Sequence, residues 1–166
     1  FRRVLFRSQA ETDAVEFRQL TVMFADMVGS VELGQRMNVE DYRDLLSRFR
    51  ALIVEAVQAH KGFIARHHGD GVLVYFGFPN ASESDAERAV DAALHIVDSI
   101  RQLEHPFPHR VEVRIGVATG TAIVGDVLAT SHSEQSEFAA LGPTPNLAAR
   151  LQGLVSPDSC VISATT

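Results

Sequence analysis

Two aspartates beside predicted β-structure constrain the fold of this chain more than any other feature. The first, Asp26, follows the apolar run of residues 20–25 and precedes the small-residue turn of residues 27–30. The second, Asp70, lies between two glycines with β-favouring residues on both sides, a pattern typical of a hairpin tip. If the two strands are neighbours in one sheet, both carboxylates project from the same edge.

Two such carboxylates at one edge create an electrostatic conflict. Aspartate side chains have a reference pKa of about 3.9, so both are expected to be ionised at neutral pH. At a separation of about 4 Å they would repel each other by roughly 4 kcal/mol at an effective dielectric near 20. A hard divalent cation removes this conflict, and ligation by oxygen alone favours Mg²⁺ or Mn²⁺. The sequence therefore predicts a divalent cation site formed by Asp26 and Asp70.

Composition narrows the class of protein. The 166 residues, 46% of them hydrophobic, suit one domain, which we place at residues 17–166 after a basic tail or linker at residues 1–16. A net charge of −6 without a basic stripe argues against general nucleic-acid binding. Cys160 is the single cysteine, so no disulfide framework is expected. No apolar run reaches the length of about 20 residues that a membrane helix needs, so a cytoplasmic location is expected.

Helical and strand patterns alternate along the chain. Asn38 begins a predicted helix that ends near Gly62, and Ser84 with Glu87 forms a capping box for a second helix. A third helix is predicted to open with Thr144 as its cap and Pro145 as its first helical residue. The predicted strands cover residues 20–25, 63–66, 72–78, 111–118, 121–128 and 160–162, with a polar excursion at 129–137. This order predicts an α+β, ferredoxin-like sandwich: a βαββαβ core plus extra strands, with a mixed or antiparallel sheet and helices packed on one face.

The third predicted helix carries two polar residues suited to a nucleotide. Asn146 and Arg150 are four residues apart and therefore lie on one helix face, while Leu147 and Leu151 take a different face and can pack inward. An amide beside a planar cation suits a sugar oxygen and a phosphate oxygen. In the turn after Asp26, Gly29 would let the backbone approach a phosphate.

The segments FADMVGS, GDG and GPTPNLAARLQ occur in this order, and residues 18–162 resemble the catalytic domain of the class III nucleotide cyclases, the adenylate/guanylate cyclase family. The resemblance implies that Asp26 and Asp70, with Met27, hold two Mg²⁺ or Mn²⁺ ions. It implies that Asn146 orients the ribose and that Arg150 stabilises charge on the α-phosphate. It also implies a head-to-tail homodimer in which the metal carboxylates of one subunit face the Asn and Arg of the other. The residues assigned to substrate binding by the resemblance are Val28, Gly29, Ser30, Arg66, Gly69 and Ala139.

The implied activity is conversion of ATP to 3′,5′-cyclic AMP and pyrophosphate in signalling, and base selectivity stays open. Many family members carry a Lys where this chain has Arg66, and an Asp, Thr or Ser where it has Ala139. Arg66 offers only donors, which suit guanine as well as adenine, so GTP is an alternative substrate. Thr121 replaces a frequent basic residue, and strands that often supply a Lys for the terminal phosphates are expected after Thr166.

Two further alternatives follow from these departures and from the hairpin. Arg66, Thr121 and Ala139 favour a non-catalytic nucleotide-sensing or dimerisation module of a larger regulator. A diguanylate cyclase shares a carboxylate-tipped hairpin, but this chain lacks that family's Gly-Gly-Asp/Glu-Glu-Phe stretch.

Overall fold

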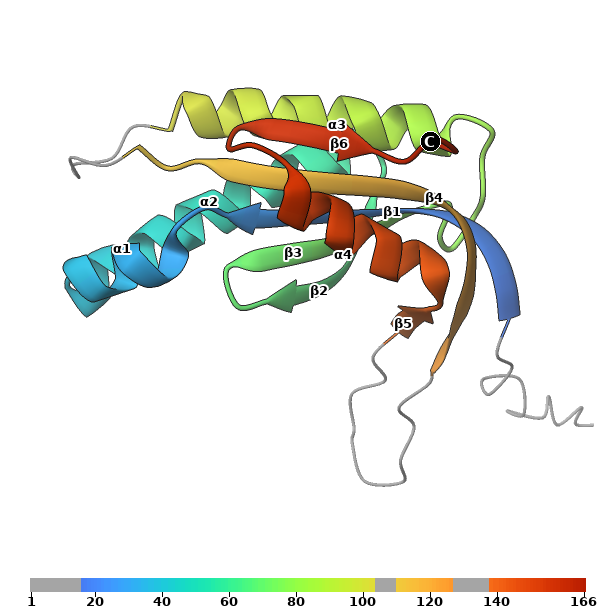
Figure 1. Ribbon diagram of the computed structural model, residues 1–166, viewed down its shortest axis with the longest axis horizontal. Coiled ribbons are helices and arrows are strands. Elements are labelled where there is room, and N and C mark those ends of the chain that lie inside the picture. Colours follow the sequence, from blue (N-terminus) through green and yellow to red (C-terminus); the bar gives the residue numbers. More distant parts are fainter. Residues whose placement is uncertain (1–15, 104–109, 127–137) are drawn as a thin grey trace, which may run out of the picture.

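The computed structural model describes residues 16–103, 110–126 and 138–166, so most of the predicted tail and the predicted excursion at 129–137 lie outside the described residues. Within them, strands and helices alternate along the chain (Figure 1). The elements are β1 (Glu16–Met27), α1 (Ser30–Arg36), α2 (Val39–Ala59), β2 (Phe63–His68), β3 (Gly71–Phe76), α3 (Asp85–Arg101), β4 (Val113–Asp126), β5 (Phe138–Leu141), α4 (Pro143–Leu154) and β6 (Ser159–Ile162).

All the described strands belong to one mixed sheet. The order β2-β3-β1-β4-β5 is antiparallel throughout, and β6 pairs in parallel with the first half of β4. The longest pairing joins β1 to β4 from Glu16 opposite Val124 to Met27 opposite Val113. The predicted α+β class with a mixed sheet is therefore confirmed.

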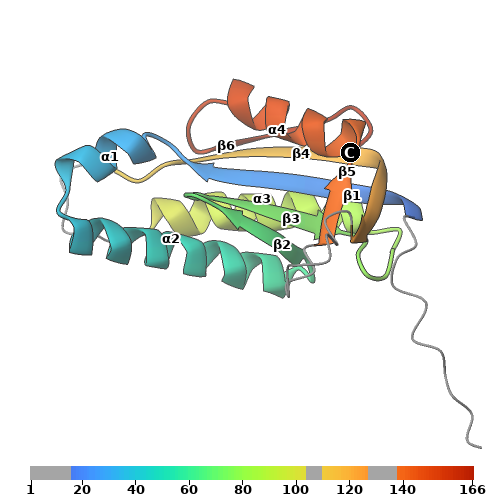
Figure 2. The same cartoon turned by 90° about the horizontal axis from the view of Figure 1, so that it is seen from below.

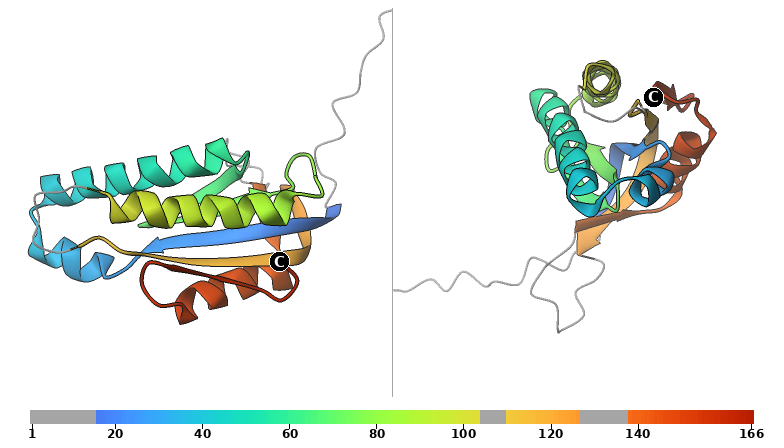
Figure 3. Two further views of the ribbon diagram at one scale, coloured as in Figure 1. Left: turned by 90° about the horizontal axis from the view of Figure 1, so that it is seen from above. Right: turned by 90° about the vertical axis from the view of Figure 1, so that its left-hand side faces the viewer.

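The helices cover both faces of the sheet, which corrects the prediction that they pack on one face. α2 and α3 lie on one side and α4 on the other (Figures 2 and 3). Side chains alternate along a strand, so Met23 and Ala25 of β1 join the core under α2 and α3, while Leu20 and Val22 join the core with Ala148 of α4. The central strand is apolar on both faces, and one layer of helices would leave half of it in water.

The strand pair predicted around Thr119 and Gly120 is one continuous strand, β4. Both residues remain paired with β1, opposite Thr21 and Leu20. A Cβ atom at Gly120 would lie 2.8 Å from the Thr144 hydroxyl oxygen at the start of α4. Gly120 is therefore a site of close approach between strand and helix, not a turn residue.

Two elements were not predicted. α1 begins directly at Ser30, where the sequence indicated only a turn, and its seven residues hold a single buried side chain, Leu33. β5 pairs with the second half of β4, with Leu141 opposite Ile123. Both elements are too short to show a clear hydrophobic period.

The helix caps gave mixed outcomes. Asn38 caps α2 as predicted, since its side-chain oxygen accepts from the amide of Asp41 at 2.9 Å. Ser84 makes no side-chain cap on α3, so the predicted capping box is wrong. α4 begins at Pro143 after Gly142, two residues earlier than predicted. Thr144 instead donates its hydroxyl to the carbonyl of Thr121 at 2.8 Å, which ties α4 to β4.

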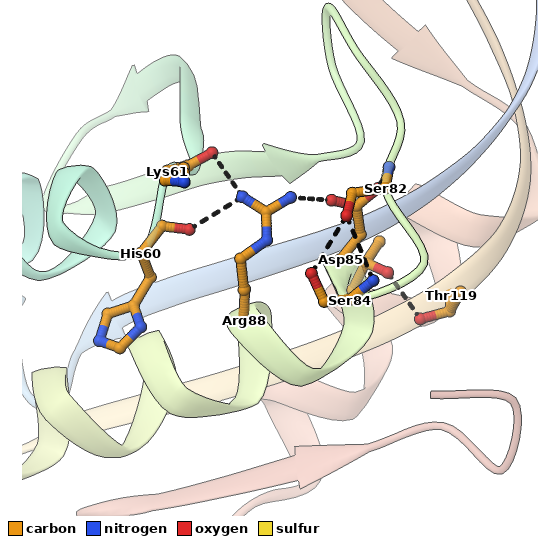
Figure 4. A network of polar contacts seen from close by, with 8 residues as sticks. His60, Lys61, Ser82, Ser84, Asp85, Arg88 and Thr119 are labelled. Atoms are coloured by element: carbon orange, nitrogen blue, oxygen red, sulfur yellow. Dashed lines mark hydrogen bonds and ion pairs between the residues drawn. The ribbon is translucent and has the colours of Figure 1, made fainter.

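The first turn of α3 is held by a polar clasp, shown in Figure 4. Asp85 accepts from the amide of Ser82 at 2.7 Å and forms an ion pair with Arg88. Arg88 also donates to the carbonyls of His60 and Lys61 at 3.3 and 3.4 Å. The Ser84 hydroxyl, which was predicted to cap the helix, instead lies 3.1 Å from the Ser82 hydroxyl.

Candidate functional site

The fold brings Asp26 and Asp70 together at one edge of the sheet. β1 and β3 are neighbours with Ala25 opposite Val72, so the turn before β3 lies beside the end of β1. The Asp26 side chain is a third exposed and lies beside the Asp70 side chain, to which it can donate a hydrogen bond when it is protonated. The two residues are 44 positions apart in sequence, and only the order of the strands makes them adjacent.

This arrangement raises the pKa of Asp26 from its ordinary value of 3.8 to about 6. The largest cause is burial, followed by the charge of Asp70 and the hydrogen bond with its side chain. The nearby Arg114 charge and a backbone hydrogen bond at Met27 act in the opposite direction. Near Asp26, the two carboxylates carry more negative charge than the single positive charge of Arg114 neutralises.

Two residues that the sequence did not single out complete the surroundings of Asp26. Arg114 lies opposite Asp26 in the β1–β4 register, and its Nη2 is 3.9 Å from Asp26 Oδ2. Gln152, near the end of α4, donates its Nε2 to the same oxygen at 3.3 Å. The sequence hardly indicates that these two residues reach Asp26, because the contact of Arg114 depends on strand register and that of Gln152 on the position of α4.

The turn after Asp26 is shaped mostly by the backbone. The Met27 side chain is buried in the core, so only its backbone carbonyl could face a cation. Val28 donates its amide to the carbonyl of Glu112 at 2.9 Å, and Gly29 is the N-cap residue of α1. The Ser30 side chain hydrogen-bonds Tyr42 of α2.

The donor set fits a hard divalent cation. Two carboxylates converge with oxygen atoms only, and no group of three His, Cys, Asp or Glu side chains that could hold a metal occurs in the described part of the chain. Mg²⁺ is commonly bound by one or two carboxylates, with substrate phosphates and water completing the shell. A pair of aspartates is therefore sufficient for a metal that arrives with a nucleotide.

Arg66 and Ala139, which the family resemblance assigns to binding the nucleotide base, both lie near Tyr75. Its buried hydroxyl accepts from the amide of Ala140 at 2.9 Å, which fixes β5 and therefore the backbone of Ala139. Burial raises the pKa of Tyr75, and the charge of exposed Arg66 lowers it, so Arg66 lies near the same ring.

Asn146 and Arg150 make no hydrogen bond or ion pair with the carboxylates of Asp26 and Asp70 among the described residues. Both side chains are exposed on α4, whose buried face consists of Thr144, Pro145 and Ala148. Leu147 was expected to pack inward, but it is 42% exposed. Neither Asn146 nor Arg150 has a hydrogen bond or ion pair with another described residue. One chain therefore presents a pair of aspartates together with an exposed Asn–Arg pair on α4 that does not contact them among the described residues.

Comparison with known proteins decides the family. The sequence profile of the adenylate and guanylate cyclase catalytic domain matches residues 12–166. The chain belongs to this family.

Relatives of this cyclase domain occur in bacteria. Adenylate cyclase 1 of Rhizobium meliloti is 32% identical over 142 residues, which cover 82% of this chain and 21% of that protein. An uncharacterised Mycobacterium tuberculosis protein is 36% identical over 136 residues, which cover 82% of this chain and 24% of that protein. The cyclase domain therefore spans about a quarter or less of the length of these curated relatives.

Solved cyclase structures share the fold. The adenylyl cyclase CyaB from P. aeruginosa gives a TM-score of 0.86 at 26% identity, over 92% of this chain and 80% of that chain. The guanylate cyclase domain of RhGC from Catenaria anguillulae, solved with GTP, gives 0.81 at 21% identity, over 89% and 80%. Among the described residues, no helix combines the length and apolar character needed to cross a membrane.

Proposed function

We propose that this domain converts ATP to 3′,5′-cyclic AMP and pyrophosphate in a signalling protein. The observation that carries the proposal is the contact between Asp26 and Asp70 beside Arg114, in a chain of the cyclase family. The ribose 3′-oxygen would bond to the α-phosphorus as the bond from that phosphorus to the pyrophosphate oxygen breaks. The 3′-hydroxyl proton would be released in the same step.

The residues divide the work by their chemistry. Asp26 and Asp70 would hold Mg²⁺ or Mn²⁺, with the backbone of Met27 beside them. Such ions, when bound, lower the pKa of an attacking hydroxyl and stabilise charge on phosphate oxygens. Arg114, 3.9 Å from Asp26, is placed to pair with phosphate oxygens at the same edge.

The phosphate-binding turn and the base-binding positions complete the proposed assignment. Val28 and Gly29 lead into α1, which begins at Ser30, at the carboxylate edge. Because the Val28 amide is bonded to Glu112, the backbone amides of Gly29 and Ser30 would be the ones to approach the phosphates, with Val28 beside them. Gly69, in the turn beside Asp70, would do the same from the hairpin. Arg66 and the backbone around Ala139, which lie near each other through Tyr75, would contact the base.

Asn146 and Arg150 are proposed to act on a nucleotide held by the carboxylates of a second copy. In one chain both are exposed and make no contact with Asp26 or Asp70 among the described residues. Leu147 and Leu154, on the same helix, are 42% and 82% exposed, and apolar side chains of this kind favour association. A head-to-tail homodimer would bring Asn146 to the ribose and Arg150 to the α-phosphate.

The decisive test offers ATP and GTP separately to the purified protein with Mn²⁺ and measures cyclic products by chromatography. Cyclic AMP is the expected main product. Cyclic GMP as the main product would assign guanylate cyclase activity, for which the donor-only side chain of Arg66 is the favouring feature. Binding of an ATP analogue without any product would support the non-catalytic alternative.

Mixing variants tests the shared site. Arg150→Ala alone should lower turnover by about 10² to 10³, by analogy with removal of one donor to a developing charge. A mixture of Asp70→Ala and Arg150→Ala chains should recover part of the activity, because one of the two sites in a mixed dimer is intact. No recovery in a mixture shown to contain mixed dimers would contradict shared sites.

A cytoplasmic location stays a prediction from the sequence.

A further inference from the structure

The hairpin tip that carries Asp70 is tied to α2 by a single arginine. Arg50, in the second half of α2, donates its Nη2 to the carbonyl of Gly69, the residue directly before Asp70. Gly69 has φ +60°, and a Cβ atom built on it would meet nothing within 4 Å. The turn is therefore not packed from that side, and the hydrogen bond from Arg50 restrains it.

The same helix also reaches the other side of the carboxylate edge. Tyr42 hydrogen-bonds the Ser30 side chain at the start of α1. Burial and the charge of Asp70 raise the pKa of Tyr42, while the Ser30 hydrogen bond and the Arg50 charge lower it. α2 therefore contacts both sides of the carboxylate edge: Tyr42 reaches Ser30 at the start of α1, and Arg50 reaches Gly69 at the hairpin tip.

The environment of Arg50 separates it from an ordinary surface arginine. Its Nε is buried and has no hydrogen-bond partner, which costs free energy. Arg43 and Arg48 on the same helix are exposed to solvent. The contact with the hairpin tip is the interaction that offsets this cost.

We infer that Arg50 is a positioning residue that holds Asp70 at the distance from Asp26 required to bind a divalent cation. Arg50 is itself a cation and cannot be a metal ligand, so it acts through the backbone of Gly69. This inference rests on the proposed function, since it assigns a role toward the metal that Asp26 and Asp70 would hold.

The sign of the effect separates positioning from simple electrostatics. Arg50 places a positive charge near the site, so removing it would strengthen Mn²⁺ binding if charge alone mattered. If Arg50 positions Asp70, the same change weakens binding, and residues that orient metal ligands typically contribute about 10- to 100-fold in affinity. Arg50→Lys keeps the charge but loses the planar fork, so positioning predicts weaker binding there as well.

The experiment measures Mn²⁺ binding to the purified chain by isothermal titration, with thermal unfolding followed by circular dichroism. Arg50→Met is expected to weaken Mn²⁺ binding at least about tenfold and Arg50→Lys to weaken it less. The matched control, Arg48→Met, removes the same charge from an exposed position on the same helix and should leave binding unchanged. In an Asp70→Asn background, Arg50→Met should have no further effect on residual binding, because its route to the metal is already lost.

The outcomes keep the two proposals distinguishable. If the wild-type chain binds no Mn²⁺ even with an ATP analogue present, the proposed function fails at its metal site. If the wild type binds Mn²⁺ while Arg50→Met and Arg50→Lys bind it equally well or more tightly, the role of Arg50 is overturned and the function stands. If Arg50→Met does not fold, Arg50→Lys decides, because unchanged Mn²⁺ affinity in that variant excludes positioning.

Discussion

Two part-buried aspartates near opposite ends of β1 have an arginine neighbour each, yet their surroundings differ. Asp85, near Gln19 and Gly77, has a side chain 11% exposed, an ion pair with Arg88 and a hydrogen bond from the amide of Ser82. Asp26 is a third exposed, 3.9 Å from Arg114, and shares a hydrogen bond with a second carboxylate.

The difference is the reason for proposing the Asp26 end, and not the Asp85 end, as the ligand site. At the Asp85 end the protein supplies the partners of the carboxylate, and the clasp joins α3 to the turn after α2 (Figure 4). At the Asp26 end negative charge is in excess, and the pKa of Asp26 is raised to about 6 as a result of burial and the Asp70 charge. Excess charge held in place by the fold is typical of a site that awaits a cation.

The largest effect is expected from Asp26→Asn. If Asp26 is a metal ligand, as the proposed function requires, its loss should remove several kcal/mol of transition-state stabilisation and lower turnover about 10³-fold or more. The metal-free protein should be no less stable, because the change removes repulsion with Asp70. Cyclic nucleotide assays measure turnover, and thermal unfolding in EDTA measures the stability of the metal-free protein. Near-normal turnover would show that the Asp26 end of β1 is not the metal site.

Asp85→Ala should show the opposite pattern. It leaves Arg88 and the amide of Ser82 without their acceptor, so the free energy of unfolding should fall by about 1–3 kcal/mol. Turnover per folded molecule should stay within about twofold, since the clasp lies at the far end of β1. Urea unfolding measures the free energy of unfolding. If Asp26→Asn lowered it as much as Asp85→Ala does, the two ends of β1 would not differ in the way described.

A smaller effect concerns pH. The folded pKa of Asp26, about 6, lies above its ordinary value of 3.8, so between these values the folded chain holds a proton that the unfolded chain has lost. Stability of the metal-free protein should therefore fall as pH rises from about 4 through about 6. At pH 5 a cation must displace this proton, so Mn²⁺ affinity should be about tenfold lower than at pH 7.5.

Thermal unfolding with Mn²⁺ and with EDTA at these two pH values tests this linkage. Mn²⁺ should raise the melting temperature more at pH 7.5 than at pH 5. Asp26→Asn should remove the fall in metal-free stability, while Asp85→Asn should leave it in place. A fall that survives in Asp26→Asn would assign the linkage to another group.

The smallest effect is expected from Gln152→Leu. The change removes one hydrogen bond, 3.3 Å long, to Asp26 Oδ2 and leaves Arg114 and Asp70 in place. Mn²⁺ affinity should change by a few-fold, within the range of about 0.5–1.5 kcal/mol for one hydrogen bond. An effect as large as that of Asp26→Asn would show that Gln152 takes a direct part in the site.

The sequence predicted the parts of the fold that follow from local pattern. The Asn38 cap, the hairpin around Asp70 and the strand before Asp26 depend on neighbouring residues, and the structure contains all three. Gly120 was interpreted as a turn because a glycine in a strand pattern usually marks one. Glycine is required there because the side chain of Thr144 lies against it. Thr144 is 24 positions later in the sequence, so no local pattern shows this contact.

The surroundings of the candidate site could not be predicted for the same reason. Arg114 reaches Asp26 through strand register, Gln152 through the placement of α4, and Arg50 reaches the hairpin tip from α2. Contacts between distant elements decide all three. The capping box predicted at Ser84 failed locally, because the Ser84 hydroxyl faces that of Ser82 and makes no cap.

The direct seating of α4 on β4 has a mechanical consequence. At Gly116 a Cβ atom would lie 2.3 Å from the carbonyl oxygen of Ala148 and 2.4 Å from the amide nitrogen of Gln152, so helix backbone rests on strand backbone with no side chain between them. Because no side chain lies between the two backbones at this point, a shift of α4 along β4 would bring backbone atoms of the helix and the strand into steric clash. We therefore expect α4, with Arg150, to move together with the sheet, so that any tightening around a nucleotide would come from elements other than this pair.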